Sequence, residues 1–307
     1  MILEVVGCDY CGFKHVIPIP DQDELDEYYK KRYHETSKGA LLLENKSQNK
    51  TEEEHLILKY NDILSYIQSY AINKEVLDVG CASGHLLLFL KENGFNSYGI
   101  EPSEKEVEKA VSRGLDVRKG TAETMQDKYD SLKFGVILLN HVIEHVRHPK
   151  LILKNCHDLL TDSGIIIAQV PNDFSPIQLS VKNTAKANWW ISPPEHLNYF
   201  NKESITSLLE KSGFEILHFT ATFPIDMFLL MGDDYTSDSK LGKEVYLRTA
   251  NFELGLYKNG QNSLRKKILK ELANLEIGRD FIIVARKKTF NEFDSLICNR
   301  ANRTITK

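Results

Sequence analysis

Between residues 76 and 170, five short apolar runs alternate with segments of helical periodicity, and this alternation restricts the fold more than any other feature. Strands separated by helices are expected to lie parallel in one sheet, with helices on both faces. Two further apolar runs follow, and a mainly helical stretch separates them. The sequence therefore predicts an α/β fold whose strands lie near 76–79, 97–100, 117–119, 134–139, 164–170, 214–219 and 281–285.

The chain has 307 residues, enough for one large core and an appended element but short for two catalytic domains. A helix is expected over 53–70, where apolar residues recur at helical spacing. We therefore predict four parts: an N-terminal knuckle and arm, a core, a helical insertion, and a last strand with a tail. Their boundaries are 1–52, 53–222, 223–279 and 280–307.

Charge and composition exclude several classes of partner. The formal net charge is -4 and the isoelectric point is about 6.2, so no basic field favours nucleic acid. No apolar stretch approaches the roughly 18 residues needed to span a bilayer. The N-terminus lacks a secretory pattern, and the five cysteines are widely spread. We expect a cytoplasmic protein with no membrane partner.

The first apolar run ends in a glycine turn, Val76-Leu77-Asp78-Val79-Gly80-Cys81-Ala82-Ser83-Gly84. Such a turn brings backbone N–H groups close to a ligand, and Gly80 and Gly84 are expected to remove side chains where a nucleoside approaches. Asp78 would place a carboxylate beside a cationic group. The spacing is neither that of a dinucleotide fingerprint nor that of a phosphate loop.

An acidic residue ends the second apolar run. Glu101 follows Asp78 by 23 residues, and a carboxylate at this place can accept hydrogen bonds from both ribose hydroxyls. Pro102 then interrupts the strand, and Ser103 is expected to cap the next helix. Together these residues predict a nucleoside site that contacts no phosphate.

These motifs resemble those of class I methyltransferases that use S-adenosylmethionine (SAM), and the resemblance extends from 75 to about 221. It includes Gly99-Ile100-Glu101-Pro102-Ser103, the turn Gly120-Thr121-Ala122-Glu123, and the strand that ends at Asn140-His141. The resemblance implies a Rossmann-like seven-stranded sheet of order 3-2-1-4-5-7-6 with strand 7 antiparallel, an N-terminal arm, and a helical insertion before the last strand. It implies SAM as cofactor, held by Asp78, Gly80, Gly84, Glu101, Pro102, Ala122 and Asn140.

Methyl transfer to a hydroxyl requires a positioned acceptor and a group that removes its proton. Residues 140–149 follow the fourth strand beside the expected sulfonium, and a helical turn there would place His141, Glu144, His145 and His148 on one face. His141 is the preferred base, while Glu144 and His145 alternatively hold the loop. The segment also resembles quinone-pathway O-methyltransferases, where acids and a His hold a divalent ion. His141 replaces one such acid, so we predict no metal.

A second histidine, His196, precedes a predicted helix over 201–212. Related methyltransferases often have a His at this place that faces the acceptor pocket. His196 is therefore a candidate base or substrate anchor, with a structural role as the alternative. Trp189 and Trp190 either stack on a sugar and cover the pocket or belong to the core.

The N-terminus contains a Cys8-x-x-Cys11-Gly12 knuckle, to which His15 and His34 could add metal ligands. No second Cys pair follows, so a knuckle without zinc is the preferred interpretation. The following arm, with Tyr28, Tyr29, Arg32 and Tyr33, either closes over the methionine end of the donor or forms a plain amphipathic helix.

The insertion contains two segments with alternative interpretations. Arg265, Lys266 and Lys267 meet a phosphate of a nucleotide sugar or form a solvated face. The apolar residues at 228–231 suggest a homodimer contact.

The leading functional hypothesis is SAM-dependent O-methylation of a small acceptor, a sugar or nucleotide-linked sugar in a surface-glycan pathway. The first alternative is a methyltransferase for a quinone or aromatic small molecule, and the second is a SAM-binding module without catalysis. A nicotinamide dehydrogenase is disfavoured because the third glycine of its fingerprint is missing.

Overall fold

The computed structural model describes residues 3–25, 27–28, 49–181 and 188–288. Its main sheet has seven strands in the order β5-β4-β3-β6-β7-β10-β9. Counted along the chain within this sheet, the order is 3-2-1-4-5-7-6, which confirms the predicted arrangement. The strands are β3 (Glu75–Val79), β4 (Asn96–Glu101), β5 (Asp116–Lys119), β6 (Phe134–Asn140), β7 (Leu160–Pro171), β9 (Phe214–Ala221) and β10 (Asp280–Lys287).

The last strand, β10, is inserted between β7 and β9 and runs antiparallel to both. The first five strands pair in parallel, so their carboxyl ends lie at one edge of the sheet. The beginning of β10 reaches this same edge because Asp280 pairs with Pro171 at the end of β7. This edge is where open α/β sheets bind their ligands.

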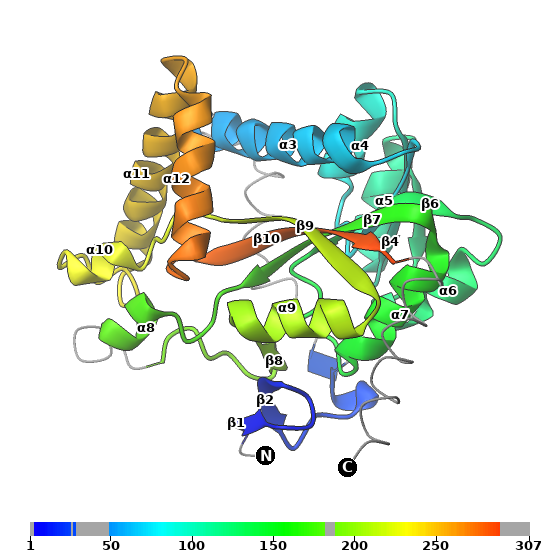
Figure 1. The fold of residues 1–307 in the computed structure, drawn as a ribbon, viewed down its shortest axis with the longest axis horizontal. Coiled ribbons are helices and arrows are strands. Elements are labelled where there is room, and N and C mark those ends of the chain that lie inside the picture. The colour runs from blue at the N-terminus through cyan, green and yellow to red at the C-terminus, as the bar shows by residue number, and fades with distance from the viewer. Residues whose placement is uncertain (1–2, 26, 29–48, 182–187, 289–307) are drawn as a thin grey trace, which may run out of the picture.

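Helices cover both faces of the sheet (Figure 1). The helices α3 (Lys50–Tyr70) and α4 (His85–Glu92) pack on one face, where Leu64 and Leu90 meet strand residues such as Val136. On the other face lie α7 (Pro149–Leu159) and α9 (Lys202–Lys211). Strand β6 is buried from Phe134 to Leu139 because both of its faces are covered, which explains its nearly continuous apolar sequence. The remaining core elements are α5 (Glu104–Ser112), η1 (Ala122–Thr124), α6 (Met125–Lys128) and α8 (Pro176–Ser180).

The N-terminal knuckle is a β-hairpin of β1 (Glu4–Cys8) and β2 (Phe13–Ile17), as expected. The short strand β8 (Asn198–Tyr199) joins it in a second, three-stranded sheet. Phe13 packs against Phe200 with ring centroids 5.0 Å apart, which connects the hairpin to the main core. The predicted arm residues Tyr29, Arg32, Tyr33 and His34 lie outside the described residues.

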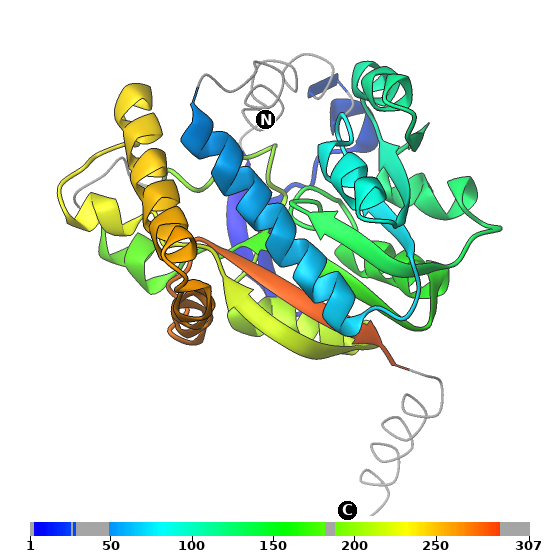
Figure 2. The ribbon, with the colours of Figure 1, turned by 90° about the horizontal axis from the view of Figure 1, so that it is seen from above.

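The predicted insertion is helical and contains α10 (Met227–Leu230), α11 (Ser239–Lys258) and α12 (Asn262–Asn274). Figure 2 shows α11 beside α3, above the edge of the sheet formed by β9. Arg265 of α12 is 1% exposed and holds this layer together, because its guanidinium donates to both Asp62 oxygens at 2.6 and 2.7 Å and to Glu253 at 2.9 Å. The proposed phosphate contact of Arg265 is therefore wrong.

In the described ranges, no helix combines the length and the apolar character that crossing a membrane requires.

Candidate active site at the carboxyl edge of the sheet

The glycine turn after β3 is fixed by backbone bonds to the neighbouring strand. The N–H groups of Gly80 and Cys81 both donate to the Ile100 carbonyl, at 2.8 and 3.2 Å. Gly80 has φ of +73°, a conformation that favours glycine, and a Cβ there would meet only Val142 at 3.5 Å. The turn is therefore not tightly packed at Gly80, and the approach of a nucleoside to this position stays a prediction.

Gly84 packs closely against a neighbouring side chain. A Cβ on Gly84 would lie 2.5 Å from Leu115 Cδ1, and the residue has φ of +76° at the start of α4. Only glycine combines this conformation with the close approach of Leu115. Packing against Leu115 therefore explains the need for glycine at this position, and the contact of Gly84 with a nucleoside stays a prediction.

Glu101, at the end of β4, is directly connected to the glycine turn. Its carboxylate accepts the Ala82 N–H at 3.0 Å and the Ser103 N–H at 2.8 Å, and the residue is 1% exposed. Burial raises the pKa of Glu101 to about 7 despite these bonds. Ser103 occupies the N-cap of α5 as expected, but its side chain makes no capping bond.

Asp78 is a second buried carboxylate beside the first. It is 4% exposed, and burial together with the charge of Glu101 raises its pKa to about 8. Within the described part of the chain, no donor is hydrogen-bonded to its side chain. Two buried carboxylates with raised pKa values are stabilised by a cationic ligand, and SAM carries both a sulfonium and an ammonium group. The residues present therefore fit the cofactor that the sequence predicts.

The other predicted cofactor residues border the same edge. Pro102 is exposed after Glu101, and Ala122 is buried at the start of η1, in the turn that follows β5. Gly120 donates its N–H to the Glu101 carbonyl at 3.1 Å, so this turn is tied to the acidic strand end. Asn140 is the last residue of β6. The sheet thus gathers at one edge the donor residues that are scattered over the sequence.

The segment after β6 forms a series of turns and not the expected helix. His141 has φ of +52°, its N–H donates to the Gln169 carbonyl at 2.9 Å, and its Nδ1 lies 2.9 Å from Glu144 Oε1. The predicted grouping of His141, Glu144 and His145 is present. His148 instead begins α7 as an exposed N-cap residue, so its expected place on the same face is wrong.

The electrostatics separate the two main histidine candidates. The side chain of His141 is partly exposed, and partial desolvation opposes its charge. The hydrogen bond to Glu144 and the charges of Asp280 and Glu144 outweigh this effect and raise the pKa of His141 to about 9. Burial and the neighbouring His145 lower the pKa of His196 to about 4. Burial opposes charge on Glu144, but its bond to His141 prevails and holds its pKa below the ordinary value. His141 is therefore mostly protonated near pH 7 and accepts a proton only at high pH, where its neutral form is populated. His196 is neutral near pH 7.

His145 and His196 lie together, with ring centroids 4.9 Å apart. His145 Nδ1 donates to the Glu195 carbonyl at 2.6 Å. His196 Nδ1 and Glu144 Oε2 are buried and have no hydrogen-bond partner within the described ranges. Ligand atoms of Glu144, His145 and His196 lie within 4.8 Å of one another. One carboxylate and two imidazoles do not fit the hard, oxygen-preferring divalent ion implied by the quinone-pathway resemblance, so we derive no step through a metal.

Comparison with known proteins agrees with this arrangement of motifs. A family model described as a methyltransferase domain matches residues 37–219, which is more than half of the chain. The chain belongs to this family. The methyltransferase domain also shares its fold with a SAM-dependent methyltransferase from Archaeoglobus fulgidus, at a TM-score of 0.52 and 20% identity over 81% of this chain and 99% of that one.

Curated relatives are similar to about half of the chain. A ubiquinone biosynthesis O-methyltransferase of Agrobacterium fabrum is 29% identical over 48% of this chain, and the chain spans 62% of that relative's length. A ubiquinone biosynthesis O-methyltransferase of Actinobacillus pleuropneumoniae is 29% identical over 52% of this chain and 78% of that relative's length.

Sequence reasoning missed two polar residues at the histidine site. The Gln169 amide lies 3.0 Å from His141 Nε2 and donates to Asp280 Oδ2 at 3.1 Å. Asp280 also accepts a hydrogen bond from Thr222. The available signal was a single polar residue, Gln169, inside the apolar strand 164–170.

Sequence reasoning also missed Asp173, which is buried, and Arg279, which is half-buried, near this cluster. Burial raises the pKa of Asp173 to about 7, although the charge of Arg279 opposes the rise. Neither Asp173 carboxylate oxygen has a hydrogen-bond partner among the residues that the structure describes. Asp226 lies 4.0 Å from the Arg279 guanidinium, which joins the insertion to this region.

The two tryptophans divide between the alternatives. Trp190 is 3% exposed and packs edge-on against Phe174 at 5.8 Å, so it belongs to the core. Trp189 is partly exposed beside it, at 4.7 Å between ring centroids.

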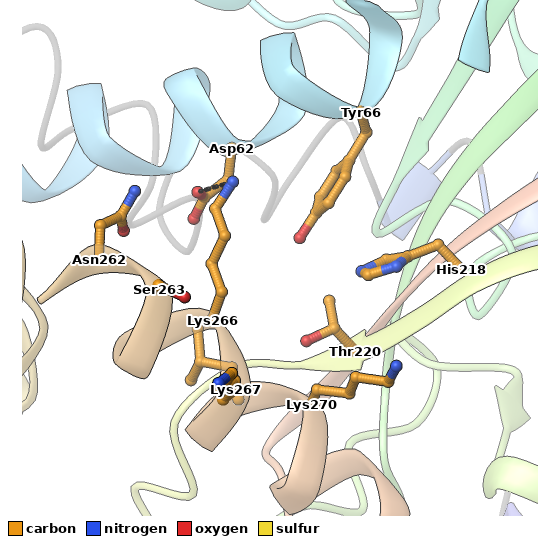
Figure 3. A pocket seen from close by; sticks show the side chains of 10 residues that line it. Asp62, Tyr66, His218, Thr220, Asn262, Ser263, Lys266, Lys267 and Lys270 are labelled. Atoms are coloured by element: carbon orange, nitrogen blue, oxygen red, sulfur yellow. Dashed lines mark ion pairs between the residues drawn. The ribbon is translucent and has the colours of Figure 1, made fainter. Parts of the chain in front are cut away.

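The lysines of α12 line a basic pocket of about 440 Å³ between α3 and α12, over β9 (Figure 3). Lys266 is directed to Asp62 at 3.7 Å and to Ser65 at 3.2 Å, and Lys267 and Lys270 lie farther along the same helix. This pocket is lined by the edge strand β9, whereas the donor site lies at the ends of β3 and β4. A phosphate contact of Lys266 and Lys267 beside the donor is therefore not supported.

Leu230 and Met231 are exposed, and the homodimer contact stays a prediction.

Proposed function

We propose that this protein transfers the methyl group of SAM to a hydroxyl oxygen of a small acceptor. The observation that carries the proposal is the pair of buried carboxylates, Asp78 and Glu101, at the ends of adjacent parallel strands with the glycine turn between them. Membership in the methyltransferase-domain family supports it. The Glu101 carboxylate accepts hydrogen bonds from the ribose hydroxyls, and the Asp78 carboxylate compensates the positive charge of the donor.

Catalysis requires the acceptor oxygen to lie in line with the sulfonium methyl group, which SAM supplies as the electrophile. His141 stands directly after β6, and Glu144 orients its ring through Nδ1. His141 Nε2 therefore removes the proton from the hydroxyl of the substrate once the Gln169 amide has moved away from this nitrogen. The Glu144 carboxylate stabilises the resulting imidazolium. His196 is the second candidate base, and its unpartnered Nδ1 is also suited to anchor the acceptor.

Two classes of acceptor remain as alternatives within this proposal. The sequence favours a sugar or nucleotide-linked sugar. The similarity to ubiquinone biosynthesis O-methyltransferases favours a phenolic quinone precursor, and this observation makes it the second candidate. The partly exposed Trp189 near the acceptor side can stack on either ring system. We further propose that the protein works in the cytoplasm without nucleic-acid or membrane partners.

The proposal is tested in two steps. Calorimetry should detect binding of SAM and of its demethylated product, and no binding of NADH. A methyl-transfer screen with radiolabelled SAM against phenols and nucleotide sugars should then give a labelled product in one class. Tight NADH binding without SAM binding would refute the cofactor assignment, and SAM binding without any turnover would favour a module that lacks catalysis.

A further inference from the structure

The N-terminal hairpin brings together three side chains that the methyl-transfer site does not use. Cys8 ends β1, Cys11 lies in the turn, and His15 lies in β2. One ligand atom from each, two sulfurs and a ring nitrogen, lies within 4.8 Å of the others. The sequence alone favours a knuckle without metal because it offers only one Cys pair, but the hairpin register adds a third ligand.

The register explains why His15 joins the cysteines. Cys8 pairs with Phe13 and Val6 pairs with His15, so these four side chains share one face of the hairpin. Cys8 and His15 are therefore diagonal neighbours across the two strands. The β2–β8 ladder holds His15 in place, since His15 pairs with Asn198.

The turn has the backbone arrangement of a thiolate-binding knuckle. The Cys11 N–H points at Cys8 Sγ at 3.3 Å, and the Gly12 N–H donates to the Cys8 carbonyl at 2.8 Å. Gly12 has φ of +81°, which lets the chain reverse immediately after Cys11. An N–H directed at sulfur stabilises the thiolate form, and the thiolate is the form that binds metals.

The tautomer of His15 is also fixed for ligation. Its Nδ1 lies 2.9 Å from the Val16 carbonyl, which can only accept, so Nδ1 carries the proton. This leaves Nε2 with its lone pair available. A second-shell bond from the other ring nitrogen to a carbonyl is the usual arrangement around metal-bound histidines.

We infer that Cys8, Cys11 and His15 bind one zinc ion. Two thiolates and one imidazole match the preference of Zn²⁺, whereas Mg²⁺ and Ca²⁺ require oxygen ligands. Zn–S bonds of about 2.3 Å in a tetrahedral site separate two sulfurs by about 3.8 Å. The observed limit of 4.8 Å requires an inward movement of only about 1 Å, which side-chain rotation provides.

A fourth position is available for water or another ligand. Among the described residues, no fourth His, Cys, Asp or Glu joins the group. The site is therefore expected to exchange metal faster than a closed structural zinc site does.

The bound ion would brace the histidine loop, because the hairpin is connected to it by backbone bonds. The Val16 N–H donates to the Leu197 carbonyl at 2.9 Å, and the N–H groups of Leu197 and Asn198 both donate to the Glu144 carbonyl, at 2.8 and 2.9 Å. A hairpin of two five-residue strands is marginal without support, and one metal ion adds a crosslink where the chain reverses.

The test uses the full-length protein, reduced and freed of metal, and does not depend on methyl transfer. Titration with Co²⁺ should give one equivalent of binding with a sulfur-to-cobalt charge-transfer band, and Zn²⁺ should displace it while Mg²⁺ should not. Zinc should also raise the melting temperature. Absence of the band, or binding of cobalt without sulfur ligation, would overturn the inference.

Variants assign the ligands. Cys8→Ser and Cys11→Ser should each abolish the charge-transfer intensity or halve it, and His15→Ala should weaken metal binding at least about 100-fold, the upper end of what loss of a second-shell partner costs. The matched control is Asp9→Asn, an exposed turn residue that should leave binding unchanged. Full affinity in His15→Ala, or an unchanged spectrum in both cysteine variants, would show that the metal lies elsewhere. Far-ultraviolet circular dichroism of each variant distinguishes loss of ligation from loss of folding.

Discussion

The donor side and the acceptor side of the site are built in different ways. On the donor side, Glu101 ends β4, and the glycine turn and Ala122 lie in the short segments that lead from β3 and β5 into the next helices. On the acceptor side, His141 meets Gln169 and Asp280, which follow it by 28 and 139 residues. Local sequence therefore specifies the donor side, whereas the complete sheet must form before the acceptor side exists.

The largest effect is expected on the acceptor side. Replacing His141 with Ala should lower turnover at least about 100-fold if it is the base, with SAM affinity unchanged. The control is His148→Ala, because the structure places this exposed residue at the start of α7, away from the His141–Glu144 pair. Steady-state kinetics with calorimetric SAM binding checks both. Normal turnover of His141→Ala would transfer the role of base to His196.

The pH profile sharpens the same comparison. The pKa of His141 is raised from 6.5 to about 9, so the neutral form that accepts a proton increases up to about pH 9, and kcat/KM should rise tenfold per unit below it. The stability from charged His141 is complete below about pH 6.5 and is lost as the pH rises through 9. A profile that is flat above about pH 5 would instead fit His196, whose pKa is lowered to about 4.

Substitutions on the donor side should weaken the binding of SAM and leave the methyl-transfer step itself unchanged. Glu101→Ala and Asp78→Ala should each weaken SAM binding by about 1–3 kcal/mol, as for lost bonds to a charged group. The control is Glu104→Ala, an exposed residue of α5 whose Lys119 partner lies 2.8 Å away. Isothermal calorimetry measures the change. Unchanged affinity in both site variants would contradict the assignment of this edge to the donor.

The free energy of unfolding should depend more on the buried bonds that anchor the acceptor side than on ordinary surface hydrogen bonds. The buried Asn198 amide donates to the carbonyls of Ile143 and Val146, at 3.1 and 2.7 Å. Asn198→Ala leaves two buried carbonyls unsatisfied and should lower the free energy of unfolding by about 1–3 kcal/mol. Asn93→Ala removes one exposed bond to Phe89 and should cost less. Equal denaturation midpoints for the two variants would contradict the anchoring role.

The smallest effect is a release of protons when the donor binds. Asp78 and Glu101 have raised pKa values of about 8 and 7, so both are partly protonated near pH 7. A cationic ligand lowers these pKa values, so the two carboxyl groups together should release fewer than two protons per SAM bound. Calorimetry in buffers of different ionisation enthalpy measures the number, and the demethylated product, which lacks the sulfonium, should release fewer. Proton uptake would contradict the model.

The sequence predicts the strand order, the hairpin and the helical insertion because each depends on a local pattern of apolar residues or on family motifs. The predicted donor residues are brought to one edge of the sheet, and Gly84 among them fits against Leu115. It does not predict the turns at 141–147, since their shape follows from bonds to Gln169, Glu195 and Asn198 in distant segments. The role of Arg265 was likewise hidden, because its partners Asp62 and Glu253 are not close to it in sequence.

The reversed direction of β10 has a consequence for how this architecture can diversify. A strand that runs against its neighbours begins where they finish, so the residues just before it arrive at the rim that holds the reactive groups. Here those residues close the insertion, and the carbonyls of Glu276 and Gly278 accept bonds from Asn172 at the end of β7. Changes of length or composition within 223–279 can therefore remodel the acceptor chamber while the nucleoside cradle, made by earlier strands, keeps its shape.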